Sequence, residues 1–246
     1  MDKPRVGIFG LTGCAGDQLV ILNCEDELLT LIGALDIRDF LMASSENDTG
    51  GELDLALVEG AVMSRRDEER LRQIRARSKA LLALGTCAVW GGVAAGGDGK
   101  HAAMLAQVYG AAGAGYDSTP ARALREVVPV DFNVTGCPIE KSEFLAAVAH
   151  LLNGNPPLPA AYPVCAECRM RENNCLLIQR GELCCGPLTQ GGCAARCPAL
   201  RVPCVGCRGP AEDANLPSAL ALFADNGAPR ERVEARLRMF APGGRS

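Results

Sequence analysis

The sequence is poor in histidine and in aromatic residues. Its 246 residues include only two histidines and one tryptophan, and aromatics make up 4% of the chain. So few rings leave little material for stacking nucleic-acid bases. The net charge of −4 gives no excess of basic residues to attract nucleic acid or an anionic membrane. We therefore expect no nucleic-acid partner.

Long apolar runs and targeting signals are also missing. No stretch of about 18 apolar residues is present to span a bilayer. No charged-then-apolar leader precedes the apolar run at residues 6–9, and Arg65-Arg66 has no apolar run after it, unlike an export signal. We expect a cytoplasmic protein without direct membrane insertion, in a compartment where persistent disulfides are disfavoured. No GxGxxG motif follows the first apolar run, so nucleotide chemistry is expected to belong to a partner.

Cysteine is the residue type present in excess. CxxC spacing is typical of metal ligands rather than of packing. A disulfide framework, structural zinc and iron–sulfur clusters are the three interpretations. Iron–sulfur is favoured because Pro follows Cys137 and Cys197, as in ferredoxin-type runs, and because the densest block contains no His. Nine of the 13 cysteines lie in that block: Cys165, Cys168, Cys175, Cys184, Cys185, Cys193, Cys197, Cys204 and Cys207.

The first region, residues 1–155, alternates apolar strand-like runs with helical stretches. This alternation predicts an α/β fold with a flavodoxin-like, doubly wound parallel sheet. The predicted strands cover residues 6–9, 37–42, 53–58, 80–84 and 128–134, and the predicted helices cover 17–35, 65–78 and 141–152.

The second region, residues 156–246, differs in composition. A linker rich in Pro, Gly and Asn at 153–159 leads into the cysteine block, and residues 215–240 favour one or two helices. We expect a small irregular iron–sulfur domain with hardly any aliphatic core, in which metal ligation and folding are coupled.

Chemically active residues follow several of the predicted strands. In an open parallel sheet the carboxyl ends of the strands meet at one edge, where ligands bind. Three cysteines and one carboxylate there form a candidate four-ligand cluster site, and the neighbouring glycines allow close approach of backbone N–H groups. The alternative is that the cysteines are small buried residues in loops. The strand-end residues are Cys14, Asp17, Glu59, Cys87 and Cys137.

Five motifs resemble one family. They are Gly13-Cys-x-Gly16, Val58-Glu-Gly, Gly85-Thr-Cys-Ala-Val, Gly136-Cys-Pro and Cys204-x-Gly-Cys-Arg-Gly-Pro210. To about residue 210 the chain resembles the small, electron-transferring subunit of cytoplasmic nickel–iron hydrogenases, in the deazaflavin-reducing, methyl-viologen-reducing and sulfhydrogenase branch.

The resemblance implies three 4Fe–4S clusters. The proximal cluster takes the strand-end ligands Cys14, Asp17, Cys87 and Cys137. The distal cluster takes Cys165, Cys168, Cys175 and Cys184, with Cys165 where many relatives have His. The medial cluster takes Cys193, Cys197, Cys204 and Cys207, with Cys197 where relatives with a three-iron cluster have Pro.

Four residues have two interpretations each. Asp17 stands where most members have Cys; it is a carboxylate ligand, or it caps the following helix while water, hydroxide or Cys24 completes the iron site. Otherwise Cys24 is a packing residue. Cys185 packs or is an alternate ligand. Glu59 serves a proton path or the subunit boundary, or it makes an ordinary loop hydrogen bond.

The function that the resemblance implies is electron transfer within a hydrogenase complex. The partners would be a nickel–iron large subunit and an acceptor subunit, which is a deazaflavin or NAD(P) flavoprotein or a heterodisulfide reductase module. This chain would be one component of that enzyme and not catalytic alone. The alternatives are a cluster-bearing subunit of a hydrogenase-like or complex I-like oxidoreductase that does not act on dihydrogen, and a zinc-stabilised interaction protein.

Overall fold

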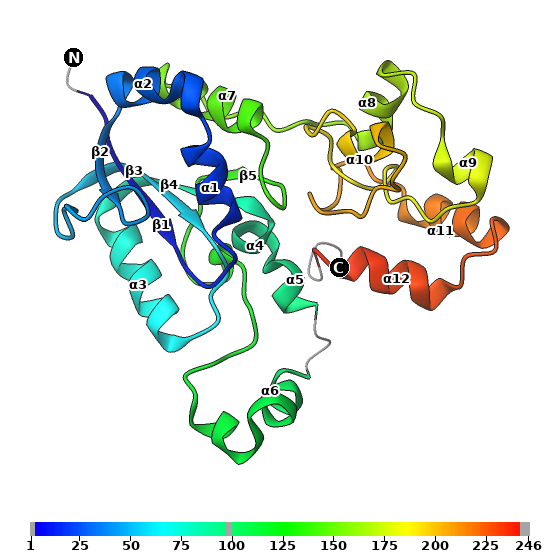
Figure 1. Cartoon of the computed structure of the whole chain (residues 1–246), viewed down its shortest axis with the longest axis horizontal. Helices are drawn as coiled ribbons and strands as arrows, with labels where there is room; N and C mark the ends of the chain where they lie inside the picture. Colours follow the sequence, from blue (N-terminus) through cyan, green and yellow to red (C-terminus); the bar gives the residue numbers. More distant parts are fainter. Residues whose placement is uncertain (1–2, 97–99, 242–246) are drawn as a thin grey trace. The chain divides into compact units, whose positions relative to one another are not determined.

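The computed structural model describes residues 3–96 and 100–241, except for the side chains of residues 28, 29, 31 and 32. The chain divides into two compact units between Pro157 and Leu158. Figure 1 shows a first unit built around a sheet and a second unit of short helices and irregular segments.

The first unit contains a five-stranded sheet in which every strand pair is parallel. Its order, β2-β1-β3-β4-β5, is that of flavodoxin-like folds, so the predicted fold class is confirmed. The strands are β1 (Arg5–Gly10), β2 (Asp36–Phe40), β3 (Leu53–Glu59), β4 (Ser78–Leu84) and β5 (Phe132–Val134).

Both faces of the sheet are buried, as expected for parallel strands. Along β3, Leu55 and Leu57 belong to one apolar core, whereas Ala56 and Val58 belong to the other. This alternation follows from the two-residue period of a strand. The helices α1 (Gly16–Leu22), α2 (Glu25–Ala34) and α7 (Lys141–Leu152) lie next to the first core, and α3 (Arg65–Ala76) and α4 (Gly85–Trp90) contribute to the second.

The single helix predicted over residues 17–35 is two helices. The chain tightens after α1, where the N–H of Cys24 donates to the carbonyl of Ile21 at 3.1 Å. The new helix α2 begins with Glu25, Asp26 and Glu27. Acidic residues in a first turn are stabilised by the helix dipole, which explains a restart at this position. The other helical segments are α5 (Gly92–Ala95), α6 (His101–Tyr109), η1 (Gly110–Gly115) and η2 (Leu124–Glu126).

The second unit has a small apolar core, in contrast to the expectation of almost none. Leu177, Leu188 and Phe223 are buried in it together with Cys185 and Cys204. Thiols therefore pack as apolar groups here beside aliphatic side chains. The helices are α8 (Val164–Met170), α9 (Leu176–Arg180), α10 (Arg196–Ala199), α11 (Leu216–Asp225) and α12 (Arg230–Arg238).

No helix in the described part of the chain is both long enough and apolar enough to cross a membrane.

Arg77 lies directly before β4 and contacts β2 and the loop that follows it. Its Nη2 lies 2.9 Å from the buried Oδ2 of Asp39, and its Nη1 donates to the carbonyls of Asp48 and Gly51 at 3.1 and 3.0 Å. The guanidinium also lies over the ring of Phe9, 5.3 Å from its centroid. One side chain thus neutralises a buried carboxylate and satisfies two loop carbonyls.

Replacing Arg77 by Met should lower the free energy of unfolding by about 3 kcal/mol, because the Asp39 carboxylate stays buried without its partner. The exposed i,i+4 pair of Arg72 with Glu68 provides the control, and Arg72→Met should cost about 0.5 kcal/mol. Urea unfolding followed by circular dichroism measures both. Equal losses in the two variants would contradict this account of Arg77.

Candidate functional site

Three cysteines and one aspartate collect at the carboxyl edge of the sheet. Cys14 lies between β1 and α1, and Asp17 lies in the first turn of α1. Cys87 lies in α4, which begins directly after β4, and Cys137 follows β5. Because the strands are parallel, these segments emerge at one edge, as the sequence predicts.

Desolvation and acidic neighbours at this edge raise the pKa of Cys87 and of Cys137. Burial raises the pKa of Cys87 to about 11, and Asp17, Cys14 and Glu59 add to the shift. Cys137 is exposed, yet partial desolvation raises its pKa to about 11, with further contributions from Cys87, Asp17 and Cys14. The site therefore concentrates groups that become anionic, an arrangement that a bound cation would stabilise.

Asp17 is almost fully buried, with 8% of its surface exposed. Its Oδ1 accepts the backbone N–H of Ile139 at 2.8 Å, across 122 residues of sequence. Burial raises the pKa of Asp17 to about 6; the Ile139 hydrogen bond opposes this shift and the charge of Glu59 adds to it. The N-cap position of α1 belongs to Ala15, so the interpretation of Asp17 as a helix cap is wrong.

Two glycines leave room for these side chains. Gly85 has φ +78°, and a Cβ there would overlap Oδ2 of Asp17. A Cβ at Gly92 would lie 2.6 Å from Sγ of Cys87. The segments are also tied together, since Thr86 N–H donates to the carbonyl of Gly136 at 2.7 Å and Gly136 N–H donates to Oγ1 of Thr86 at 3.2 Å. The donor set and this packing fit a thiolate-bound cluster.

Glu59 ends β3 and is 2% exposed. Its Oε2 accepts the N–H of Gln18, in the first turn of α1, at 2.8 Å. Glu59 therefore makes an ordinary hydrogen bond, but to the first turn of a helix and not to a loop as the sequence predicted. It connects the end of β3 to the helix that carries Asp17.

Cys24 is fully buried in the apolar core, and its Sγ donates to the carbonyl of Val20 at 3.4 Å. Burial raises its pKa. These contacts match the packing interpretation of Cys24.

In the second unit, the four cysteines assigned to the distal set lie close together. Cys165 and Cys168 lie on α8, Cys175 precedes α9, and Cys184 follows it. Burial raises the pKa of Cys165 to about 12; Cys184, Cys168 and Cys175 add to the shift, and Arg169 opposes it. A Cβ on Gly186 would lie 3.3 Å from Sγ of Cys165 and 3.6 Å from Sγ of Cys184, so this glycine also lies against the thiols.

The four cysteines assigned to the medial set are less clearly joined. Cys193 precedes α10 and Cys197 lies within it, and Cys204 and Cys207 lie in the following loop. Burial raises the pKa of Cys204 and of Cys193. The charged neighbours that contribute most to these two shifts come from outside the medial set, so the grouping of the four rests on the family resemblance.

Two backbone contacts link the distal and medial segments. The N–H of Cys204 donates to Sγ of Cys184 at 3.2 Å, and the N–H of Cys185 donates to the carbonyl of Cys204 at 2.9 Å. Cys185 itself is completely buried, and burial raises its pKa to about 12. Its surroundings match a packing role.

Sequence reasoning missed two buried charged residues of this unit. Glu167 lies between Cys165 and Cys168 and is 7% exposed, and Arg208 directly follows Cys207 and is 1% exposed. Nε of Arg208 donates to the carbonyl of Gly191 at 2.7 Å. The sequence signal that could have identified them is their position, since Glu167 lies inside one CxxC pair and Arg208 directly follows another.

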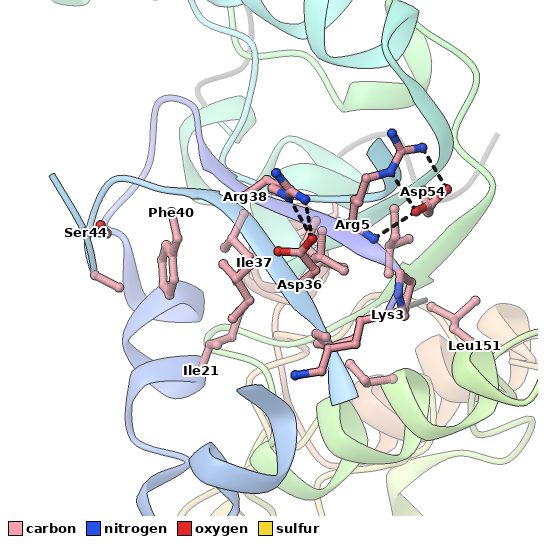
Figure 2. A pocket seen from close by; sticks show the side chains of 18 of the residues that line it. Lys3, Arg5, Ile21, Asp36, Ile37, Arg38, Phe40, Ser44, Asp54 and Leu151 are labelled. Carbon is pink, nitrogen blue, oxygen red and sulfur yellow. Dashed lines mark hydrogen bonds and ion pairs between the residues drawn. The ribbon is translucent and has the colours of Figure 1, made fainter. Parts of the chain in front are cut away.

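A separate cavity of about 1650 Å³ lies in the first unit, lined mainly by β1, β2, β3 and α7. Figure 2 shows two charged pairs among its lining residues, Arg5 with Asp54 and Arg38 with Asp36. None of its described lining residues is a cysteine. Across the described residues, no three His, Cys, Asp or Glu side chains close on a point that would hold a single metal ion. A four-iron cluster is wider than one ion, and its ligands bond separate irons.

A flavodoxin-like sheet that gathers thiols and a carboxylate at its ligand-binding edge places the chain among α/β proteins built for redox or metal chemistry. A family model described as the NADH ubiquinone oxidoreductase 20 Kd subunit matches residues 14–151, which include Cys14, Asp17, Cys87 and Cys137. The chain belongs to this family.

The alignments with similar proteins extend over the second unit as well. The chain is 38% identical over 237 residues to sulfhydrogenase 2 subunit delta of Pyrococcus furiosus, covering 96% of this chain and 99% of the relative. It is 29% identical over 239 residues to a subunit of the F420-non-reducing hydrogenase of Methanocaldococcus jannaschii, covering 83% of this chain and 81% of the relative. The predicted resemblance to hydrogenase small subunits of this branch is confirmed.

Solved structures agree with this assignment. A chain of an NAD+-reducing NiFe-hydrogenase in the H2-reduced state is 27% identical, with a TM-score of 0.56, and the match covers 64% of this chain and 95% of that one. The actinobacterial-type NiFe-hydrogenase from Ralstonia eutropha H16 matches at a TM-score of 0.63 and 18% identity, covering 91% and 85%. This second likeness shows the fold alone.

Replacing Gly85 by Ala should displace the Asp17 carboxylate and break its hydrogen bond to Ile139. We expect a loss of about 3 kcal/mol in unfolding free energy, from left-handed strain and a lost charge-assisted bond. Gly154→Ala is the control, because Gly154 has φ +72° but open space around its Cβ position, and it should cost about 1 kcal/mol. Urea midpoints of the two variants give the comparison; similar midpoints would refute the crowding at Asp17.

Proposed function

We propose that this chain is the electron-transfer subunit of a hydrogenase complex and carries three 4Fe–4S clusters. The observation that carries the proposal is the convergence of Cys14, Cys87, Cys137 and Asp17 at one sheet edge, in a chain whose relatives are hydrogenase subunits. These four residues would hold the proximal cluster. Cys165, Cys168, Cys175 and Cys184 would hold the distal cluster, and Cys193, Cys197, Cys204 and Cys207 the medial one.

Each bound 4Fe–4S cluster would supply one-electron redox chemistry. The chain's own residues donate hydrogen bonds to two of the sulfurs assigned to the distal cluster. The N–H of Cys204 points to Sγ of Cys184 at 3.2 Å, and Nδ2 of Asn173 donates to Sγ of Cys168 at 3.6 Å. Hydrogen bonds of this kind stabilise thiolate charge and tune the potential of a distal cluster.

At the sheet edge, the Ile139 N–H and the space beside Gly85 orient the Asp17 carboxylate. Carboxylate is a harder ligand than thiolate. A proximal cluster with this ligand should therefore differ in potential from one held by four cysteines.

The proposed partners are those that the family resemblance implies. A nickel–iron large subunit would receive or supply electrons at the proximal end. An acceptor subunit, either a deazaflavin or NAD(P) flavoprotein or a heterodisulfide reductase module, would exchange them at the other end. Glu59, buried beside the proximal set, is the residue we assign to the subunit boundary or a proton path. We place the complex in the cytoplasm.

A second candidate is a cluster-bearing subunit of a hydrogenase-like or complex I-like oxidoreductase that does not act on dihydrogen. The name of the family model favours it. That model, however, ends at residue 151, whereas the sulfhydrogenase relative aligns over 96% of the chain. The cysteine block therefore favours the hydrogenase proposal.

Anaerobically purified protein should contain about 12 irons and 12 acid-labile sulfides per chain, because three four-iron clusters are proposed. Metal analysis by plasma mass spectrometry and a sulfide assay measure both. About eight of each would remove one cluster from the proposal. Zinc without labile sulfide would replace it with the zinc-stabilised interaction protein.

Replacing Asp17 by Cys or by Ala should change the electron paramagnetic resonance and Mössbauer spectra of one cluster only, since one iron would change its ligand. In Asp17→Cys, all four ligands become thiolates, and the altered iron should resemble the other three. Asn23→Ala, at the end of the same helix, is the control and should leave the spectra unchanged. Wild-type spectra in both Asp17 variants would exclude ligation by this carboxylate.

A further inference from the structure

Glu167 lies between two cysteines of the distal set but reaches the medial segment. Its Oε1 accepts the N–H of Gly192 at 2.7 Å, and its Oε2 accepts the N–H of Ala195 at 3.1 Å. Sγ of Cys193 donates to the same Oε2 at 3.9 Å. A buried carboxylate thus occupies the inside of the turn that presents Cys193.

That turn is held in an unusual conformation. Ala194 and Ala195 have φ of +51° and +49°, in the left-handed region that residues with a Cβ rarely adopt. Convergent N–H groups in such a turn form an anion-binding nest, which Glu167 fills from within the chain. Nη1 of Arg171, at the end of the same helix α8, donates to the carbonyl of Ala194 at 2.9 Å. Helix α8 therefore holds the turn at both its N–H and its carbonyl groups.

The charges around Cys193 are of opposite sign. Burial raises the pKa of the Cys193 thiol; Glu167 adds to this shift, and Arg208 and the N–H groups of Arg196 and Ala195 oppose it. A negative charge a few ångströms from a redox centre disfavours an added electron in a medium of low polarity. Glu167 and Arg208 would then move the potential of a medial cluster in opposite directions.

We propose that Glu167 is a positioning residue that fixes Cys193 against α8 and holds the reduction potential of the medial cluster down relative to that of the distal cluster. This inference rests on the proposed function, because it assumes a cluster at Cys193. The Glu167 carboxylate on α8 would then have two effects. It would position a ligand of the medial cluster, and it would make reduction of the distal cluster more favourable than reduction of the medial one.

The test uses full-length protein purified anaerobically with its clusters, as wild type and as Glu167→Gln, Glu167→Ala and Glu172→Gln. Glu172 is an exposed acid just beyond α8 and serves as the charge-matched control. Redox titration followed by electron paramagnetic resonance gives the midpoint of each cluster. Iron and sulfide assays give the number of clusters in each preparation.

In Glu167→Gln, the medial midpoint should rise by an amount that changes its reduced-to-oxidised ratio about tenfold, or 59 mV for a one-electron couple. The distal midpoint should move less, and Glu172→Gln should move neither. Glu167→Ala should also lose medial iron, because it removes both carboxylate oxygens that accept the N–H groups of Gly192 and Ala195. Only molecules that contain the medial cluster contribute to its midpoint potential, so partial loss of the cluster in Glu167→Gln does not hide the shift.

An unchanged medial midpoint in Glu167→Gln would overturn the electrostatic part of the inference. Full medial iron in Glu167→Ala would overturn the positioning part. A wild-type protein without a medial cluster would instead overturn the proposed function. A further variant, Arg208→Gln, removes a positive charge, so its medial midpoint potential should fall where that of Glu167→Gln rises. Loss of packing alone would not shift the two midpoints in opposite directions.

Discussion

The parallel register of the five strands is the constraint on which the first unit depends. Parallel strands need crossovers through helices, so both sheet faces are covered and the strand ends become the accessible edge. Every chain segment that leaves a strand there is brought to the same place, whatever its distance in sequence. The hydrogen bond from Ile139 to Asp17 joins residues 122 apart and exists because β1 and β5 end on the same side of the sheet. The site is a consequence of topology before it is a consequence of any motif.

The second unit is stabilised by a different kind of core. Its core mixes thiols with a few aliphatic side chains, and Cys184, Cys185 and Cys204 lie within it. A buried thiol with a raised pKa stays protonated and acts as a weak apolar group. Metal binding would convert several of these thiols to thiolates and release their protons, which couples the stability of this unit to its metal. The sheet of the first unit has no such dependence, because its two cores consist of Val, Leu, Ile, Phe and Ala with one packed cysteine, Cys24.

Much of this organisation could be predicted from the sequence, and the reasons for success and failure are physical. The strands β1, β3 and β4 contain apolar runs, and their alternation with helices indicates a parallel sheet, from which the strand-end residues follow. The strand predicted over 128–134 is confined to Phe132–Val134. The break at Asn23 and Cys24 was missed because the apolar spacing continues through it. Glu167 was missed because its partners are the N–H groups of Gly192 and Ala195, which leave no trace in side-chain identity. Arg77 was missed for the same reason, since two of its partners are carbonyls.

The two thiol sets of the second unit depend on each other. Cys204 donates its N–H to Cys184, and Glu167 of the distal helix accepts the N–H groups around Cys193. A displacement of α8 would therefore disturb ligands assigned to both clusters, and a displaced residue 204 would remove a hydrogen bond from a distal sulfur. Under the proposed function, the two clusters of this unit share one supporting framework, whereas the proximal site rests on a sheet that is complete without it. The family resemblance assigns these cysteines to separate clusters, but backbone hydrogen bonds and one buried carboxylate link the two sets.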